Sequence, residues 1–342
     1  MGRLNMRKKL LEIKGLQTTF FTDDGQIPAV DDIDFSVHEG EILGIVGESG
    51  SGKSVTSLSI MGLIPSPPGK ITGGQVLLDG KNLAKLTDKQ MQKIRGKDVA
   101  MIFQEPMTSL NPLFTIGEQL KEAILIHNPK WSKKKAFARA IEIMKLVGLP
   151  RAEELLKDYP HQLSGGMRQR VMIAMALVCD PKVLIADEPT TALDVTIQAQ
   201  ILQLMKDLNK RMNTAVLLIT HDLGVVAETC ERVIVMYAGQ IVEEASIQEI
   251  FKTPKHPYTQ GLIKSVPDMR YKKDSLYSIP GSVPKPGTIK DGCRFAARCE
   301  FAMERCLQET PPLYEATAQH KARCFLLEEQ EVVQYVESVV EG

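Results

Sequence analysis

Apolar and polar residues alternate over short runs at the start of the chain. Residues 10–20 and 33–37 are rich in apolar residues with charged residues between them, a pattern typical of half-buried β-strands. Residues 41–46 form a compact apolar run that predicts a buried strand. A Gly/Ser loop and the helical periodicity of residues 55–63 follow this run directly. We therefore expect a β subdomain at the start of the chain, followed by a strand, a loop and a helix.

The middle of the chain changes to a helical pattern. Apolar positions recur at helix spacing from about residue 117 to 148, which predicts an inserted helical unit within about residues 105–165. Beyond this unit, strand-like runs alternate with helical stretches. The predicted strands are 183–186, 215–219 and 233–237, and the predicted helices are 169–178 and 196–212. This alternation predicts a mainly parallel α/β sheet.

Prolines and glycines mark a change in composition near residue 255. Pro254 and Pro257 are followed by a stretch rich in Pro and Gly that extends to Gly287, which predicts a linker and a small unit beyond it. A chain of 342 residues has room for two or three domains. We expect one domain over residues 1–254 and a C-terminal extension over residues 255–342.

Charge and hydropathy argue against several classes of function. Lys plus Arg and Asp plus Glu both total 42, and this zero net charge argues against nucleic acid as a partner. No run reaches the roughly 18 consecutive apolar residues of a membrane span. The basic residues at the N-terminus lead into charged sequence rather than into the apolar run of a signal peptide. We expect a cytosolic chain.

The Gly/Ser loop carries a specific phosphate-binding motif, G-x-x-x-x-G-K-[ST]. Its residues are Gly47, Glu48, Ser49, Gly50, Ser51, Gly52, Lys53 and Ser54. The glycines let backbone N–H groups turn inward around phosphates, at the start of a helix whose dipole favours anions. Lys53 is predicted to pair with the β- and γ-phosphates of a nucleotide, and Ser54 to bind Mg²⁺. The alternative, a Gly-rich turn without a ligand, is disfavoured by the strand and helix that flank the loop.

Two adjacent carboxylates end the predicted strand 183–186. At the carboxyl end of a parallel strand, Asp187 would reach Mg²⁺, while Glu188 would point toward a water in line with the γ-phosphate. Asp187 is thus a predicted metal ligand and Glu188 a predicted general base. A solvated strand end with two charges is the alternative, and the phosphate-binding loop makes it the weaker one.

Residues 163–170, Leu-Ser-Gly-Gly-Met-Arg-Gln-Arg, strongly resemble the signature motif of ABC-type ATPases. Four further residues match other motifs of that family in order along the chain. They are Phe20 (adenine-stacking aromatic), Gln104 (Q-loop), Asp194 (D-loop) and His221 (switch histidine). The resemblance implies an α/β P-loop NTPase fold with an N-terminal antiparallel β subdomain, an inserted helical subdomain and a small Cys-rich C-terminal extension. Taken alone, Phe20 or its neighbour Phe21 would also suit a packed core, and His221 a structural role.

The resemblance also implies an ATP-hydrolysing enzyme that works as a dimer. In the family, the signature motif of one ATPase closes over ATP held by the other. The residues that would act on a partner's nucleotide are Ser164, Gly165, Gly166 and Gln169. Glu188 and His221 are the implied catalytic residues, and His221 would contact the γ-phosphate. Gln104 would join Ser54 and Asp187 at Mg²⁺ and pass closure to the helical subdomain, which touches a membrane permease in this family.

A narrower resemblance is to the ATPase subunits of dipeptide, oligopeptide and nickel importers. It is carried by residues 105–112, 159–162, 256–262 and 279–284. It implies import of di- or oligopeptides, with nickel or another small solute as the alternative. The implied partners are a second, paralogous ATPase, two transmembrane permease subunits that hold the chain at the cytoplasmic face, and, indirectly, an extracytoplasmic substrate-binding protein. A soluble ABC ATPase of DNA repair or translation is the rival, but the chain shows neither a second nucleotide domain nor a long coiled-coil insertion.

Four of the six cysteines gather near the C-terminus. They are Cys293, Cys299, Cys306 and Cys324. A cytosolic setting disfavours lasting disulfides, so ligation of a metal by thiolates is the natural alternative. The spacing lacks the short C-x-x-C pattern of zinc sites and suits an iron–sulfur cluster, with zinc and reduced structural thiols as alternatives. The extension of the importer family carries a [4Fe-4S] cluster, and the resemblance implies one here.

Overall fold

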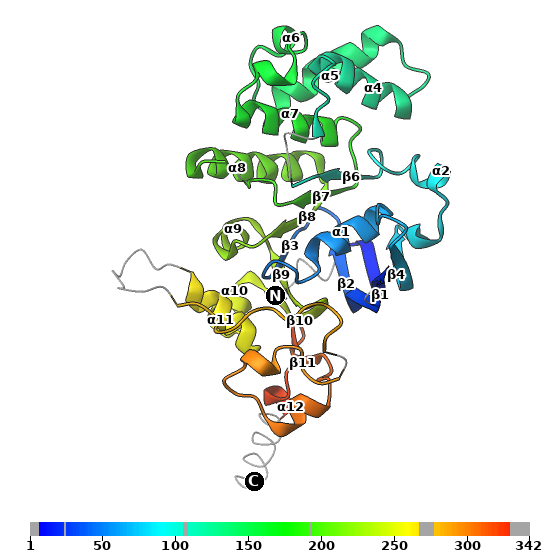
Figure 1. Ribbon diagram of the computed structural model, residues 1–342. Coiled ribbons are helices and arrows are strands. Elements are labelled where there is room, and N and C mark those ends of the chain that lie inside the picture. The colour runs from blue at the N-terminus through cyan, green and yellow to red at the C-terminus, as the bar shows by residue number, and fades with distance from the viewer. Residues whose placement is uncertain are drawn as a thin grey trace.

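Two β-sheets form the centre of the protein, with a group of helices at one end and the C-terminal segment at the other (Figure 1). The computed structural model describes residues 7–23, 25–104, 109–191, 193–266, 277–289 and 291–328. Residues 105–108, which carry part of the importer resemblance, lie outside this description. Within the described ranges, no helix combines the length and apolar composition that a membrane crossing requires.

The smaller sheet is the predicted N-terminal β subdomain. Its strands pair in the order β2-β1-β4-β5, and every pairing is antiparallel. The strands are β1 (Lys9–Thr22), β2 (Gly25–His38), β4 (Gly69–Leu78) and β5 (Lys81–Asn82). The predicted strands 10–20 and 33–37 are thus confirmed as parts of β1 and β2, whereas β4 and β5 had no predicted counterpart.

The larger sheet has the order β11-β12-β10-β9-β3-β8-β7-β6. Strands β9, β3, β8, β7 and β6 are parallel, as the alternation of strands and helices predicted. They are β3 (Ile42–Val46), β6 (Val99–Ile102), β7 (Val183–Asp187), β8 (Ala215–Thr220) and β9 (Arg232–Tyr237). The antiparallel members are β10 (Gln240–Ser246), β11 (Tyr314–Thr317) and β12 (His320–Ala322).

Strand β3 shows why the parallel strands are continuous apolar runs. All five of its residues are buried, because both faces of the sheet are covered. Ile42 and Val46 face one hydrophobic core, which includes residues of the helical region, and Leu43 and Ile45 face a second core shared with the antiparallel sheet. The period-two alternation of a strand therefore divides the interior into two cores, with β3 between them.

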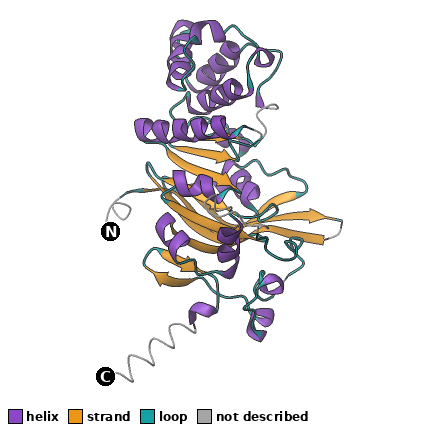
Figure 2. Cartoon of the chain, turned by 90° about the vertical axis from the view of Figure 1, so that its left-hand side faces the viewer, coloured by secondary structure: helices purple, strands orange, loops and turns teal. Residues whose placement is uncertain are grey.

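Helices cover the large sheet and build the inserted helical region. They are α1 (Lys53–Met61), α2 (Asp88–Met91), α4 (Ile116–His127), α5 (Lys133–Leu146), α6 (Ala152–Leu155), α7 (Gly165–Leu177), α8 (Val195–Met212), α9 (Leu223–Thr229), α10 (Ile247–Lys252), α11 (Pro257–Ser265) and α12 (Glu304–Gln308). Helices α4 to α7 cluster beyond the edge strand β6, and Figure 2 shows this cluster stacked on the end of the sheet. A capping box formed by Thr115 and Glu118 fixes the start of α4.

The C-terminal segment joins the large sheet instead of standing apart from it. Strand β12 pairs with β10 through Glu243 and Ala322, and β11 continues the sheet beyond β12. Buried Glu243 reinforces this pairing, since it lies 2.6 Å from Nε2 of buried His320 and accepts a hydrogen bond from the backbone N–H of His256. The expectation of a separate appendage missed this continuity, because strands of three and four residues give no readable alternation.

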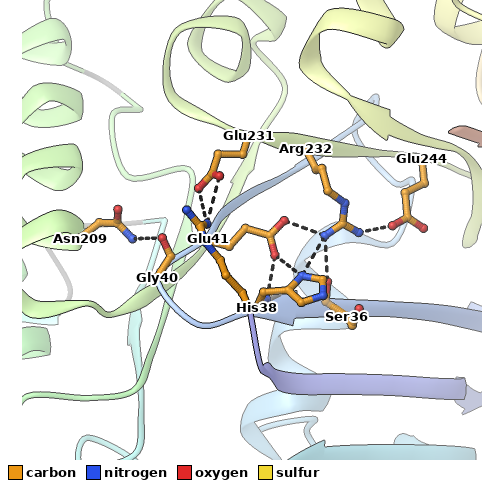
Figure 3. A network of polar contacts seen from close by, with 9 residues as sticks. Ser36, His38, Gly40, Glu41, Asn209, Glu231, Arg232 and Glu244 are labelled. Carbon is orange, nitrogen blue, oxygen red and sulfur yellow. Dashed lines mark hydrogen bonds and ion pairs between the residues drawn. The ribbon is translucent and has the colours of Figure 1, made fainter. Parts of the chain in front are cut away.

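A buried charge network ties the antiparallel sheet to the large sheet (Figure 3). Glu41 is fully buried just before β3, and its carboxylate lies 2.6 Å from Nη1 of Arg232 and accepts a 2.7 Å hydrogen bond from the backbone N–H of His38. Arg232 also pairs with Glu244 of β10 and donates to the carbonyl of Ser36 in β2. Burial alone would raise the pKa of Glu41, but the bond from His38 and the charge of Arg232 lower it. The network lies at the amino end of β3, the end opposite the phosphate-binding loop.

Candidate functional site

The candidate site lies at the carboxyl ends of four neighbouring parallel strands. The phosphate-binding loop follows β3, Asp187 ends β7, and His221 comes directly after β8. Gln104 follows β6 at the same edge of the sheet. Open α/β sheets bind their ligands at this edge, because loops from several strands converge there.

The loop at residues 47–54 has the backbone shape that its glycines allow. A Cβ atom on Gly47 would lie 2.2 Å from the carbonyl oxygen of Met236, and Gly52 has φ of 101° at the start of α1. The ammonium group of Lys53 donates to the carbonyls of Gly47 at 2.7 Å and Glu48 at 3.0 Å. Burial lowers the pKa of Lys53, against the opposing effect of nearby carboxylates. The lysine is thus held within the concave side of its own loop, where phosphate oxygens can replace the carbonyls as partners.

Ser54 and Asp187, the two predicted magnesium ligands, lie side by side. The Ser54 hydroxyl donates to Oδ1 of Asp187 at 3.3 Å, and the Ser57 hydroxyl donates to Oδ2 at 3.3 Å. Burial raises the pKa of Asp187, and the charge of Glu188 adds to this effect against the two hydroxyl hydrogen bonds. A buried carboxylate next to a hydroxyl is the oxygen donor set that Mg²⁺ prefers, so these residues fit the ion.

Two predicted residues that follow separate strands, Gln104 and His221, meet at the carboxylate of a third, Glu188. Gln104 donates its amide N–H to Oε2 at 2.9 Å, and Nδ1 of His221 lies 3.2 Å from Oε1. Thr191 donates to Oε2 at 3.0 Å. Burial would raise the pKa of Glu188, but its bonds to His221, Thr191 and Gln104 lower it. The carboxylate is therefore held ionised and oriented, and Glu188 adopts a left-handed backbone with φ of 48°, a costly conformation for a non-glycine residue.

Comparison with known proteins identifies the family. Residues 30–191 match the ABC transporter family, and residues 242–306 match the C-terminal region of oligopeptide/dipeptide transporters. The oligopeptide transport ATP-binding protein AppD of Bacillus subtilis is 57% identical over 94% of this chain and 98% of its own length. The chain belongs to the oligopeptide/dipeptide family of ABC transporter ATP-binding proteins. The dipeptide transport ATP-binding protein DppD of the same organism is 50% identical over 94% of this chain and 96% of its own length.

Solved structures show the same ABC ATPase cassette. A dimeric structure of MJ0796, a bacterial ABC transporter cassette, is 33% identical and superposes with a TM-score of 0.62 over 70% of this chain and 99% of that one. A dimeric post-hydrolysis structure of MJ0796 bound to ADP and Pi is 32% identical, with a TM-score of 0.62 over the same shares of both chains. The α/β fold with an antiparallel N-terminal sheet is therefore that of an ABC ATPase, and the chain is an ATPase of this type.

The signature motif of this ABC ATPase lies at the start of α7. Ser164 is exposed and caps the helix by accepting a hydrogen bond from the N–H of Met167. Gln169 differs from the expectation that it faces a partner's nucleotide: it is fully buried and donates to the carbonyl of Pro189. Its amide holds the chain just after Glu188 within the same molecule, and its role at a partner's nucleotide stays a prediction.

The two remaining predicted residues of the cassette have local partners. Asp194 caps α8, since its carboxylate accepts a 2.9 Å hydrogen bond from the N–H of Ile197. Phe20 is half-buried in β1, and its ring lies over Gly69 of β4, where a Cβ atom would come within 2.9 Å of it. Phe21 is 45% exposed. The assignment of Phe20 as the adenine-stacking aromatic stays a prediction.

The four C-terminal cysteines line one small cavity of about 10 Å³, together with Phe295, Phe325 and other residues. This volume is about that of one water molecule. Burial raises the pKa of Cys293 to about 11 and that of Cys324 to about 12, and the neighbouring thiols add to both shifts. Four thiols around one cavity are the right donors for a metal cluster. However, no three His, Cys, Asp or Glu side chains in the described part of the chain are arranged to hold a metal ion.

Three contacts of the site were not predicted from the sequence. The Thr191 contact could have been anticipated from its position, because Thr191 lies three residues after Glu188 in the chain. The hydroxyl of Tyr258 accepts a hydrogen bond from the N–H of Glu48, and the guanidinium of Arg298 pairs with the Glu48 carboxylate. Tyr258 and Arg298 lie more than two hundred residues from the loop. Tyr258 falls in the importer-like segment 256–262, but no local pattern linked either residue to the loop.

Proposed function

We propose that this chain is the ATP-hydrolysing subunit that drives an importer of oligopeptides or dipeptides. The observation that carries the proposal is the convergence of Lys53, Ser54, Asp187, Glu188 and His221 at one sheet edge. Identity of 57% with an oligopeptide transport protein over nearly the whole length supports the substrate class. The match of residues 242–306 to the C-terminal region of oligopeptide/dipeptide transporters supports it independently.

The proposed roles follow from the geometry of the site. The N–H groups of residues 47–54 and the ammonium group of Lys53 bind the phosphates of ATP. Ser54, Asp187 and Gln104 would hold Mg²⁺, which supplies charge stabilisation at the β- and γ-phosphate oxygens. Glu188 accepts a proton from the attacking water, and its lowered pKa keeps it ionised for that role. His221 and Gln104 hold the Glu188 carboxylate from two sides.

A second ATPase would complete the site. Ser164 and Gly165 are exposed at the N-terminus of the thirteen-residue helix α7, and a helix N-terminus of this kind binds anions. We propose that these residues and Gly166 close over ATP held by a paralogous partner, and that Asp194 lies at the same junction. Two permease subunits would then hold the pair at the cytoplasmic face of the membrane, and a substrate-binding protein would deliver peptide from the other side.

The finer assignments include an iron–sulfur cluster on Cys293, Cys299, Cys306 and Cys324. The convergence of these thiols on one cavity supports it. Anaerobic purification should give a brown protein that contains about four iron atoms and about four sulfide ions per chain. Zinc without iron would favour a zinc site, and the absence of both metals would favour structural thiols.

Transport in a reconstituted system tests the central proposal. The full chain, its partner ATPase, the permease and the binding protein are placed in proteoliposomes, and uptake of labelled di- and oligopeptides is measured with and without ATP. We expect ATP-dependent peptide uptake that the Lys53→Ala variant abolishes. Uptake of nickel but not of peptides would overturn the substrate class, and hydrolysis that no transport substrate stimulates would overturn the coupling.

A further inference from the structure

The C-terminal segment holds the phosphate-binding loop through one ion pair. The guanidinium of Arg298 contacts both carboxylate oxygens of Glu48, with Nη1 at 2.7 Å from Oε2 and Nη2 at 3.1 Å from Oε1. The Arg298 side chain is 5% exposed, so this two-pronged contact is shielded from water on the arginine side. A bidentate, charge-assisted contact fixes orientation as well as distance.

Arg298 is itself held in place by three further bonds. Its Nε donates to the carbonyl of Pro280 at 2.8 Å, its Nη2 to the carbonyl of Ile279 at 3.3 Å, and its Nη1 to the Tyr237 hydroxyl at 3.3 Å. Together with the two bonds to Glu48, these bonds use all five N–H donors of the guanidinium. The guanidinium therefore acts as a fixed point, and Glu48 is attached to it.

Glu48 is held at its backbone as well. Its N–H donates to the hydroxyl of Tyr258 at 2.9 Å, and the Tyr258 ring is fully buried. Its carbonyl accepts from Lys53, which shapes the inside of the loop. An unpaired carboxylate at this position would repel a triphosphate, and the Arg298 charge neutralises it. The pair thus affects both the shape and the charge of the loop.

We propose that Arg298 is a positioning residue for the phosphate-binding loop, through which the C-terminal segment sets the affinity for ATP. This inference rests on the proposed role of residues 47–54 in binding ATP. Arg298 ends a short turn, η4 (Ala296–Arg298), between Cys293 and Cys299, two residues that line the cysteine cavity. A change in the cysteine site that shifts this turn would therefore alter the affinity for nucleotide. Thermodynamic linkage makes the coupling reciprocal, so bound nucleotide alters the conformational equilibrium of the turn by the same factor.

Binding of MgATP to the full-length chain tests the proposal by a double-mutant cycle. We expect Arg298→Gln to raise Kd about 10- to 150-fold, the range of a lost charge-assisted hydrogen bond. Arg298→Lys keeps the positive charge but cannot make the bidentate contact, so its rise in Kd should be smaller than that of Arg298→Gln. Adding Glu48→Gln to Arg298→Gln should recover part of the loss, because the repelling carboxylate is then gone. Arg305→Gln in the same segment, whose ion pairs with Glu309 and Glu328 are exposed, is the matched control.

Kinetics separate positioning from simple destabilisation. In the assembled transporter, Arg298→Gln should raise KM for MgATP and leave kcat at saturating ATP within about twofold, because Glu188 and His221 are unchanged. A Kd within twofold of wild type, or an equal rise in the Arg305→Gln control, would overturn the inference. If Arg298→Gln does not fold, the Kd for MgATP is measured for Arg298→Lys and for the double variant, and these values test the inference instead. Failure of the wild-type chain to bind MgATP would instead overturn the proposed function.

Discussion

Nδ1 of His221 lies 3.2 Å from Oε1 of Glu188, while Gln104 and Thr191 occupy the other oxygen of the same carboxylate. Residues that follow three different strands therefore converge on one ionised group. His221 is 64% exposed, whereas the Glu188 side chain is 14% exposed. The carboxylate is fixed and the imidazole remains accessible, which suits a base with a fixed position and a partner that can also reach a bound nucleotide.

This arrangement predicts that Glu188→Gln separates binding from hydrolysis. The amide keeps the size of the side chain but cannot accept a proton at neutral pH, so hydrolysis should fall by about 10²- to 10⁴-fold while MgATP still binds. Phosphate release by the assembled transporter and nucleotide binding by the same preparation are the measurements. Glu153→Gln, an exposed change at α6, is the control. Near-normal phosphate release from Glu188→Gln would contradict the assignment of Glu188 as the general base.

Asp187→Asn should stabilise the nucleotide-free protein and remove its response to magnesium. Burial raises the pKa of Asp187, so the folded state binds more protons than the unfolded state, and stability falls as pH rises above 3.8. The neutral amide removes the penalty for ionising Asp187 in the folded state, raising Tm by about 2–4 °C for each kcal/mol recovered. Melting curves with ATP, with and without Mg²⁺, complete the test. An undiminished magnesium-dependent rise in Tm would show that Asp187 is not a ligand.

The site residues were predictable where the signal was local. Residues 47–54 and the pair Asp187 and Glu188 each lie in one continuous motif beside an apolar strand. A parallel sheet then brings the carboxyl ends of those strands together, so the convergence of Ser54, Asp187 and Glu188 follows from the pattern of elements. The first two strands of the β subdomain and the parallel direction of the large sheet were predictable because these strands are long or fully apolar.

Contacts between distant segments could not be predicted in this way. Gln169 was assigned to a partner's nucleotide, yet it is buried, and its amide N–H donates to the backbone carbonyl of Pro189. The pairing of β12 with β10 depends on buried Glu243 and His320, which lie far apart along the chain. Arg298 has several arginine neighbours in sequence, and only the packed structure shows that it is the one that reaches the phosphate-binding loop.

Breaking the buried pair of Glu41 and Arg232 should strongly destabilise the fold. Arg232→Gln leaves an uncompensated carboxylate in a fully buried position, which costs about 3–5 kcal/mol. The expected result is a large drop in the midpoint of urea-induced unfolding. Arg151→Gln is the control, because both partners of its pair with Glu154 are more than 70% exposed. Equal midpoints for the two variants would show that the network in Figure 3 adds little.

Loss of stability in mild acid should depend on His256. Burial lowers the pKa of His256 to about 4, with Glu243 opposing the shift and Arg323 adding to it, and Nδ1 accepts a hydrogen bond from the N–H of Tyr258. The unfolded state takes up a proton below about pH 6.5 and the folded state only near pH 4, so stability falls as pH is lowered through this window, by about 3 kcal/mol from this group.

His256→Asn keeps a side chain that can cap α11 and removes the titrating group. We expect the variant to be less stable at pH 7, because a buried ring is lost, but its Tm should change less than that of wild type between pH 6.5 and 4. His161→Asn, a change at an exposed histidine, should retain the wild-type slope. If Tm falls equally for His256→Asn and wild type between pH 6.5 and 4, His256 is not the group responsible for the acid sensitivity.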